Sequence, residues 1–237
     1  VPGENEFYTS GNDGKILKWT LNSDGHEFKE IYSGEKVIEV LAVHPEGSWL
    51  AAGEGNSSIH MIPLKTGGVQ HKLAAHTARI NSLNFTPDGN YLYSASLDGR
   101  VLKWDLYGRT CTNVTLAEMN IHTADISSGG EYIAGISSQG NVTVWKPENI
   151  QERFIIQSGR RNITTIRFKP GEKILALGNA DGFVELWDVS SGEMISAVRA
   201  HRGRVNDIRF NEILNQMATA GNDKCIRIFN KIGRAHV

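Results

Sequence analysis

Cysteine is scarce in this chain of 237 residues. Only Cys111 and Cys225 are present, and they lack the C-x-x-C spacing of a metal or redox site. Two thiols cannot form a disulfide framework, so free thiols in a reducing compartment, the cytoplasm, are expected. Proline is also rare, with six residues, and no run approaches the eighteen apolar residues that a membrane-spanning helix needs.

The sequence also has no excess of charge of either sign. The formal net charge is -1 and no long basic run occurs, so the electrostatic footprint of a duplex-binding protein is absent. The eight histidines include no H-x-x-x-H pair, and the segment at 53–58, GEGNSS, lacks the Lys-Ser/Thr pair of a phosphate loop. We therefore expect no metal and no cofactor, and a nucleic-acid partner is disfavoured.

A repeated segment runs through the whole chain. The stretch SLDGRVLKWDL at 96–106 has counterparts in DGKILKWTL at 13–21, QGNVTVWKP at 139–147, DGFVELWDV at 181–189 and DKCIRIFNK at 223–231. An apolar anchor recurs every 41 to 43 residues, and each anchor follows a turn residue by six positions. The six anchors are Trp19, Ile62, Trp104, Trp145, Trp187 and Phe229, and their turn residues are Asp13, Asn56, Asp98, Gln139, Asp181 and Asp223.

Each repeat predicts four short strands. Upstream of each anchor segment lies a hairpin such as LNFTPDGNYLYSAS, in which apolar and polar residues alternate around a Gly- or Pro-containing turn. Short extended segments such as QHKLAA connect the units, and no sustained helical periodicity appears. A unit of about 42 residues with four strands matches one blade of a β-propeller.

On these residues the chain resembles the WD-repeat (WD40) β-propeller family over 1–230. The Trp-Asp ending of that family is present at Trp104-Asp105 and Trp187-Asp188, and it is altered at the other anchors. The resemblance implies an all-β propeller of about six visible blades, each a four-stranded antiparallel sheet. We expect it to be incomplete at both ends, since the chain starts inside one blade and stops after the third strand of another.

In that family a histidine, a hydroxyl residue, the turn aspartate and the tryptophan form a buried hydrogen-bonded relay. The resemblance implies a complete relay in the third repeat and partial relays in the sixth and the first. The other repeats lack the hydroxyl or the histidine, as with Leu177 in the fifth, and are expected to be held by packing. The implied relay residues are His76, Ser94, Asp98 and Trp104; His201, Thr219 and Asp223; and Thr9, Asp13 and Trp19.

A Ser, a His and an Asp in one place also suggest a hydrolase. A catalytic serine must be exposed beside its base and an oxyanion site, whereas Ser94 lies in the strand YLYSAS among core residues. The nucleophile-elbow sequence G-x-S-x-G is absent. The relay is therefore interpreted as structural, and no catalytic residue is assigned.

The resemblance implies that partners dock on the wider face of the propeller. Residues that flank the start of the innermost strand, or precede the turn aspartate, would line that face. Arginine is enriched at interface hot spots, so Arg79 and Arg204 are the expected anchors. The implied face comprises Arg79, Asn81, Leu97, Asn120, His122, Asn162, Thr164, Arg204, Asn206 and Asn222. The alternative is that these are solvated loop residues.

The innermost strands carry Ala42, Asn84, Asp125, Arg167 and Arg209 at one equivalent position, a mixed set that does not resemble a catalytic cluster. From it we predict that Asp125 and Arg167 pair between neighbouring blades.

The predicted function is a non-enzymatic scaffold or sensor that binds a protein or peptide. The alternatives are a propeller-type enzyme with a central-channel site and a nucleic-acid or chromatin-type reader. Because the chain begins inside one blade and stops after the third strand of the sixth, the parent is expected to be seven-bladed or longer. Hairpins such as TPDG resemble those of bacterial multidomain WD-repeat proteins, a resemblance that implies a nucleotide-hydrolysing domain before the repeats. The tail 231–237, KIGRAHV, breaks the pattern and is interpreted as a non-native read-through of a sequencing adapter.

Overall fold

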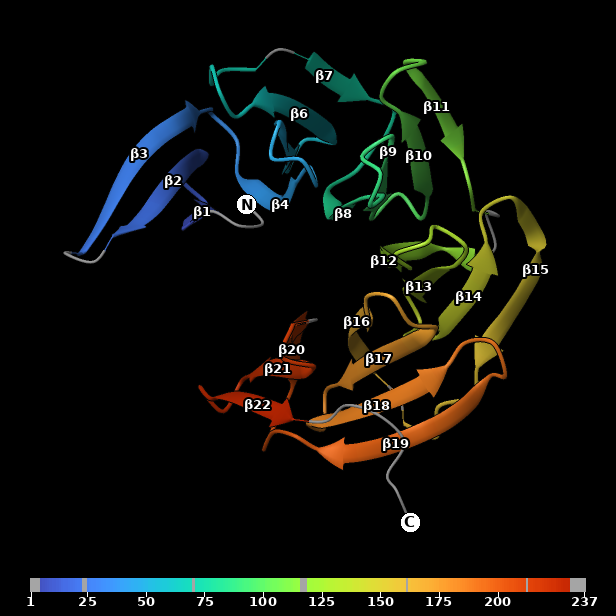
Figure 1. Ribbon diagram of the computed structural model, residues 1–237. Helices are drawn as coiled ribbons and strands as arrows, with labels where there is room; N and C mark the ends of the chain where they lie inside the picture. The colour runs from blue at the N-terminus through green and yellow to red at the C-terminus, as the bar shows by residue number, and fades with distance from the viewer. Residues whose placement is uncertain are drawn as a thin grey trace. The chain divides into compact units, whose positions relative to one another are not determined.

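The repeats fold into six antiparallel sheets, which we call blades one to six (Figure 1). The computed structural model describes residues 5–22, 25–69, 71–115, 119–160, 162–211 and 213–230, so the predicted tail 231–237 lies outside them. These residues form the strands β1 to β22. The all-β propeller prediction is thereby confirmed.

The chain divides into two compact units, 1–123 and 124–237, with the boundary inside β12. The first unit holds blade one, β1 (Glu6–Ser10), β2 (Lys15–Asn22) and β3 (Gly25–Ser33); blade two, β4 (Ile38–Val43), β5 (Trp49–Glu54), β6 (Ser58–Pro63) and β7 (His71–Ala74); and blade three, β8 (Ile80–Phe85), β9 (Tyr91–Ser96), β10 (Val101–Asp105) and β11 (Thr110–Asn113).

The second unit holds the other three blades. They are blade four, β12 (Ile121–Ile126), β13 (Ile133–Ser137), β14 (Val142–Lys146) and β15 (Asn149–Ile156); blade five, β16 (Ile163–Phe168), β17 (Ile174–Asn179), β18 (Phe183–Asp188) and β19 (Glu193–Arg199); and blade six, β20 (Val205–Asn211), β21 (Gln216–Gly221) and β22 (Ile226–Asn230). In the described residues blades one and six have three strands, as the sequence predicts, and the others have four.

The strand register is the same in every blade. Each anchor lies opposite the residue twelve positions before it, as Trp104 does to Leu92 and Ile62 to Leu50. The same offset holds for Trp19, Trp145, Trp187 and Phe229. A one-residue slip would turn every core side chain to the opposite face, so this constant register keeps all anchors on one face of their sheets.

Within each unit the core lies between successive blades. Apolar residues of blade two, such as Ile59 and Met61, pack against Leu92 and Trp104 of blade three. In the second unit, residues of blade four pack against Trp187 of blade five. A single sheet cannot cover its own apolar faces, so a blade is stabilised by packing against the blades next to it.

Candidate functional site

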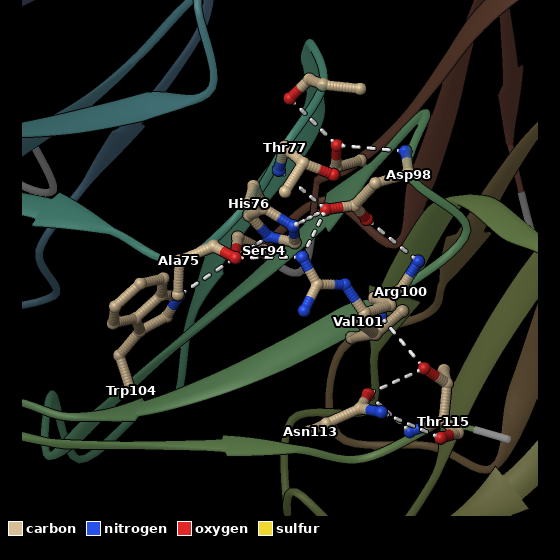
Figure 2. A network of polar contacts seen from close by, with 12 residues as sticks. Ala75, His76, Thr77, Ser94, Asp98, Arg100, Val101, Trp104, Asn113 and Thr115 are labelled. Atoms are coloured by element: carbon tan, nitrogen blue, oxygen red, sulfur yellow. Dashed lines mark hydrogen bonds and ion pairs between the residues drawn. The ribbon is translucent and has the colours of Figure 1, made fainter. Parts of the chain in front are cut away.

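The four predicted relay residues of blade three meet at one end of the sheet (Figure 2). His76 precedes β8, Ser94 lies on β9, Asp98 is in the turn that follows, and Trp104 lies on β10. The His76 Nε2 atom is 2.7 Å from Ser94 Oγ, and His76 Nδ1 is 2.9 Å from the Asp98 carboxylate. The Trp104 indole N–H donates to Ser94 Oγ over 2.8 Å. We call this arrangement, and its equivalent in other blades, the clasp.

Hydrogen-bond chemistry fixes the direction of the relay. An indole N–H can only donate, so Ser94 Oγ accepts from Trp104 and directs its own proton to His76 Nε2. The His76 proton must then lie on Nδ1, from which it is donated to Asp98. Ser94 is 1% exposed, and its hydroxyl uses both its donor and its acceptor capacity inside the relay. Such a serine is not accessible to a substrate, which supports a structural interpretation.

Electrostatics hold the Asp98 carboxylate in its charged form. Burial alone would raise its pKa, but hydrogen bonds from Arg100, the Thr77 backbone N–H and His76 outweigh burial and lower the pKa to about 2. Burial lowers the pKa of His76, against the attraction of Asp98. The Arg100 guanidinium also donates to the Ala75 carbonyl. The clasp therefore consists of a neutral imidazole and a charged, fully bonded carboxylate.

The aspartate of the Trp-Asp pair acts separately from the relay. Asp105 accepts backbone N–H groups of Tyr107 and Gly108, at 3.0 and 2.7 Å, in the turn that leads to β11. Asp188 accepts the N–H of Ser190 in the same place of blade five. A carboxylate two residues before a turn amide is a common turn-forming device. The tryptophan of the pair thus packs in the core, and the aspartate stabilises the turn that follows.

The clasp of blade six is built with a different terminal group. His201 lies 2.8 Å from Asp223 and 2.9 Å from Thr219, but Phe229 replaces the indole donor. Arg227 adds a bond of 2.7 Å to Asp223. Partial burial opposes ionisation of Asp223, yet hydrogen bonds from His201, Arg227 and the backbone lower its pKa.

The clasp of blade one is described in part. The indole of Trp19 donates to Thr9 over 2.8 Å, and Asp13 accepts the backbone N–H of Lys15.

The prediction that blade five is held by packing alone is wrong. Glu185, which is 3% exposed, accepts the Trp187 indole N–H at 3.0 Å and lies 3.1 Å from the Arg160 guanidinium. Arg160 also stacks over the Phe183 ring at 3.6 Å. A carboxylate and an arginine therefore replace the missing hydroxyl and histidine. The sequence interpretation missed them because it compared only positions where the family places its relay.

The predicted pairing of Asp125 with Arg167 is confirmed. The two side chains form an ion pair of 3.0 Å between blades four and five, and Asp125 also accepts the Phe168 backbone N–H at 2.7 Å. Arg167 lies 3.9 Å from Asp207 of blade six. This row of alternating charges links the innermost strands of the second unit.

The predicted partner face separates into exposed and half-buried residues. Asn81, His122 and Thr164 are half-buried. Asn81 donates to the His122 carbonyl at 2.9 Å, and Thr164 donates to the Val205 carbonyl at 2.5 Å, so both link one blade to the next inner strand. The exposed members are Arg79, Leu97, Asn120, Asn162, Arg204, Asn206 and Asn222.

Asn120 and Asn162 have a local structural reason for their identity. Their φ angles are +43° and +60°, in the left-handed region that asparagine tolerates better than most residues. Part of the asparagine content that predicted polar recognition therefore reflects backbone geometry. Arg79 is paired with Glu39 at 3.3 Å, while its side chain remains 53% exposed.

Within the described ranges, no group of three or more His, Cys, Asp or Glu side chains is arranged to hold a metal ion. Over the same ranges no helix has the length and apolar character to cross a membrane.

Blades of constant register, several of them closed by a clasp, define a WD40-repeat protein of the β-propeller class. The family model "WD domain, G-beta repeat" matches residues 67–105, and the model "Anaphase-promoting complex subunit 4 WD40 domain" matches residues 125–213. With the six blades, these matches show that the chain belongs to the WD40 β-propeller family.

Curated relatives share this family. The chain is 27% identical over 197 residues to the Target of rapamycin complex subunit wat1 of Schizosaccharomyces pombe, covering 79% of this chain and 62% of that protein. It is 23% identical over 226 residues to Autophagy-related protein 16 of Arabidopsis thaliana, covering 94% and 36%. It is 26% identical over 230 residues to Periodic tryptophan protein 2 of the same plant, covering 92% and 25%. The chain thus spans less than two thirds of each. Such relatives support a role in protein interaction.

Proposed function

We propose that this chain is a non-enzymatic interaction module that binds a protein or peptide through the loops held by its clasps. The observation that carries the proposal is the contrast between neighbouring residues in blade three. Ser94 is 1% exposed and wholly engaged in the relay, whereas Leu97, three residues later, is 55% exposed. The relay fixes the loop and the loop presents its side chains outward.

In the second unit, the loops of blade six carry part of the proposed surface. In blade six, Arg204, Asn206 and Asn222 are all exposed, and the Asn222 backbone N–H is bonded to the Arg204 carbonyl at 2.9 Å. This bond holds the two loops of the blade together, so their side chains form one pre-organised patch. Arginine and asparagine on a rigid support suit polar recognition of a peptide. We further propose a cytoplasmic location, since both cysteines are exposed free thiols.

Charge reversal of the two anchor arginines tests the proposal. Affinity capture with the wild-type chain isolates binders, and titration of each purified binder against the Arg79→Glu/Arg204→Glu variant then measures the change. We expect affinity to fall about tenfold or more, since charged interface groups contribute strongly when paired. Thermal stability should change by less than about 1 kcal/mol, because the Arg79 ion pair is exposed.

The matched control is Lys72→Glu/Arg109→Glu, which reverses two exposed cations elsewhere in the first unit. The proposal is contradicted if both variants bind every isolated protein as tightly as the wild-type chain does.

A further inference from the structure

A shallow depression of about 490 Å³ lies beside the clasp of blade six, and arginine dominates its lining. Arg199 at the end of β19, Arg202 in the following loop and Arg227 on β22 border it, together with Ala200 and His201. The family relay accounts for only one of these residues, His201. The arginines were not among the residues predicted from the sequence.

The depression holds uncompensated positive charge. Arg227 is neutralised by Asp223 at 2.7 Å. Arg199 and Arg202 form no ion pair with an acidic side chain in the described ranges, and both are exposed. Arg199 lies 5.9 Å from the centre of the Phe183 ring, a cation–π contact that leaves its charge unbalanced. Two free guanidinium groups therefore border one small space.

Blade three shows that a clasp does not require these arginines. The positions equivalent to Arg199, Arg202 and Arg227, each 125 residues earlier, are Ala74, Thr77 and Leu102. In blade three one arginine, Arg100, bonds to the clasp aspartate. Its guanidinium donates to the Asp98 carboxylate and to the Ala75 carbonyl. In blade six Arg227 takes part in the clasp through Asp223, so Arg199 and Arg202 are the two cations that closure of the blade does not use.

We propose that this depression binds a phosphorylated side chain of a protein partner. A phosphate monoester carries about two negative charges and three acceptor oxygens, and it therefore matches two unpaired guanidiniums better than a single carboxylate does. Arginine also presents planar donor pairs that fit phosphate oxygens. The depression is open to solvent, as a side chain on a large ligand requires. Arg204 lies in the same loop as Arg202, and Asn222 lies in the loop that leads to β22. The inference therefore rests on the proposed function and names its partner chemistry.

The test compares three oriented peptide libraries that differ only at one fixed residue, which is phosphoserine, aspartate or serine. Binding of each library to the full chain is measured by fluorescence polarisation, with inorganic phosphate as competitor. We expect the phosphoserine library to bind about tenfold more tightly than the other two, because charge-assisted bonds are lost without the phosphate. The Arg199→Ala/Arg202→Ala variant should lose that preference.

The matched control, Lys72→Ala/Arg109→Ala, removes the same charge from exposed positions of the first unit and should bind within about twofold of wild type. Arg202→Lys keeps the charge but not the planar donor pair, so it should restore only part of the affinity. Melting temperatures of all variants show that they are folded.

Three results would overturn the proposal: equal binding of the phosphoserine and aspartate libraries, full binding by the Arg199→Ala/Arg202→Ala variant, or inorganic phosphate binding as tightly as the peptide. The last result would make free phosphate the ligand. Failure of the proposed function looks different. In that case the Arg79→Glu/Arg204→Glu variant binds every captured protein as tightly as the wild-type chain does, and none of the three peptide libraries binds, with or without phosphate.

Discussion

At the scale of single residues, the relay of blade three depends on complete pairing. Within the described part of the chain, Ser94 Oγ is the hydrogen-bond partner of both the Trp104 indole and His76 Nε2, and all three groups are buried. A satisfied buried hydrogen bond adds about 0.5 to 1.5 kcal/mol, whereas one orphaned group costs about 1 to 3 kcal/mol. Loss of the middle member should therefore cost more than the bonds themselves contribute.

Ser94→Ala should lower the free energy of unfolding by about 2 to 4 kcal/mol, because it leaves a buried donor and a buried acceptor without partners. Urea denaturation followed by circular dichroism measures the change. Thr112→Ala, on the exposed strand β11, is the matched loss of a hydroxyl and should change stability by less than about 0.5 kcal/mol. Equal effects of the two substitutions would show that the relay adds no stability.

At the scale of strands and turns, the repeat spacing together with the alternation of apolar and polar residues predicts the blades. The prediction holds even at Ile62, where no tryptophan is present, because the spacing from the turn residue Asn56 is retained. The Glu185 clasp could not be predicted, because it depends on Arg160, 25 residues earlier in the chain. Nothing in the local pattern of FVELWD distinguishes a buried glutamate from a solvated one.

Turn glycines give a test at this scale. Gly182, in the turn from β17 to β18, has a φ of +88°, and an added Cβ would overlap the His201 carbonyl oxygen. Gly130, in the turn from β12 to β13, has a φ of +71° but open space around its Cα atom. Both substitutions by alanine carry the cost of a left-handed backbone, about 1 kcal/mol.

Gly182→Ala should therefore destabilise the chain by about 2 kcal/mol more than Gly130→Ala, because a steric clash with rigid backbone is added. The difference in melting temperature between the two variants measures this extra cost directly. Indistinguishable melting temperatures would contradict the close approach of the turn to blade six.

At the scale of the whole molecule, stability should depend on pH through the clasps. The pKa of His76 in the folded protein lies below its ordinary value of 6.5, so the unfolded chain binds a proton there first as pH falls. Stability therefore decreases as pH falls below about 6.5. The pKa of Asp98 is about 2 in the folded protein against an ordinary 3.8, and that of Asp223 is also lowered, so a second loss follows below about pH 4.

Melting temperatures at pH 7.5, 5.5 and 3.5 should decrease in that order. The variant Asp98→Asn should be less stable than wild type at pH 7.5 and should show a smaller further loss below pH 4, since the titrating carboxylate is gone. A melting temperature that rises between pH 7.5 and 5.5 would contradict the assignment of a neutral His76.

The anchor positions also give the chain a set of optical reporters. Trp104 and Trp187 are 6% exposed and Trp145 is 1% exposed, and each belongs to a different blade, whereas blade six has Phe229 in that place. Variants that retain one anchor tryptophan, with the other four tryptophans (Trp49 included) replaced by phenylalanine, would report the loosening of one blade by the red shift of a single indole emission. The order in which these blades open can then be read from intrinsic fluorescence alone, with blades two and six dark.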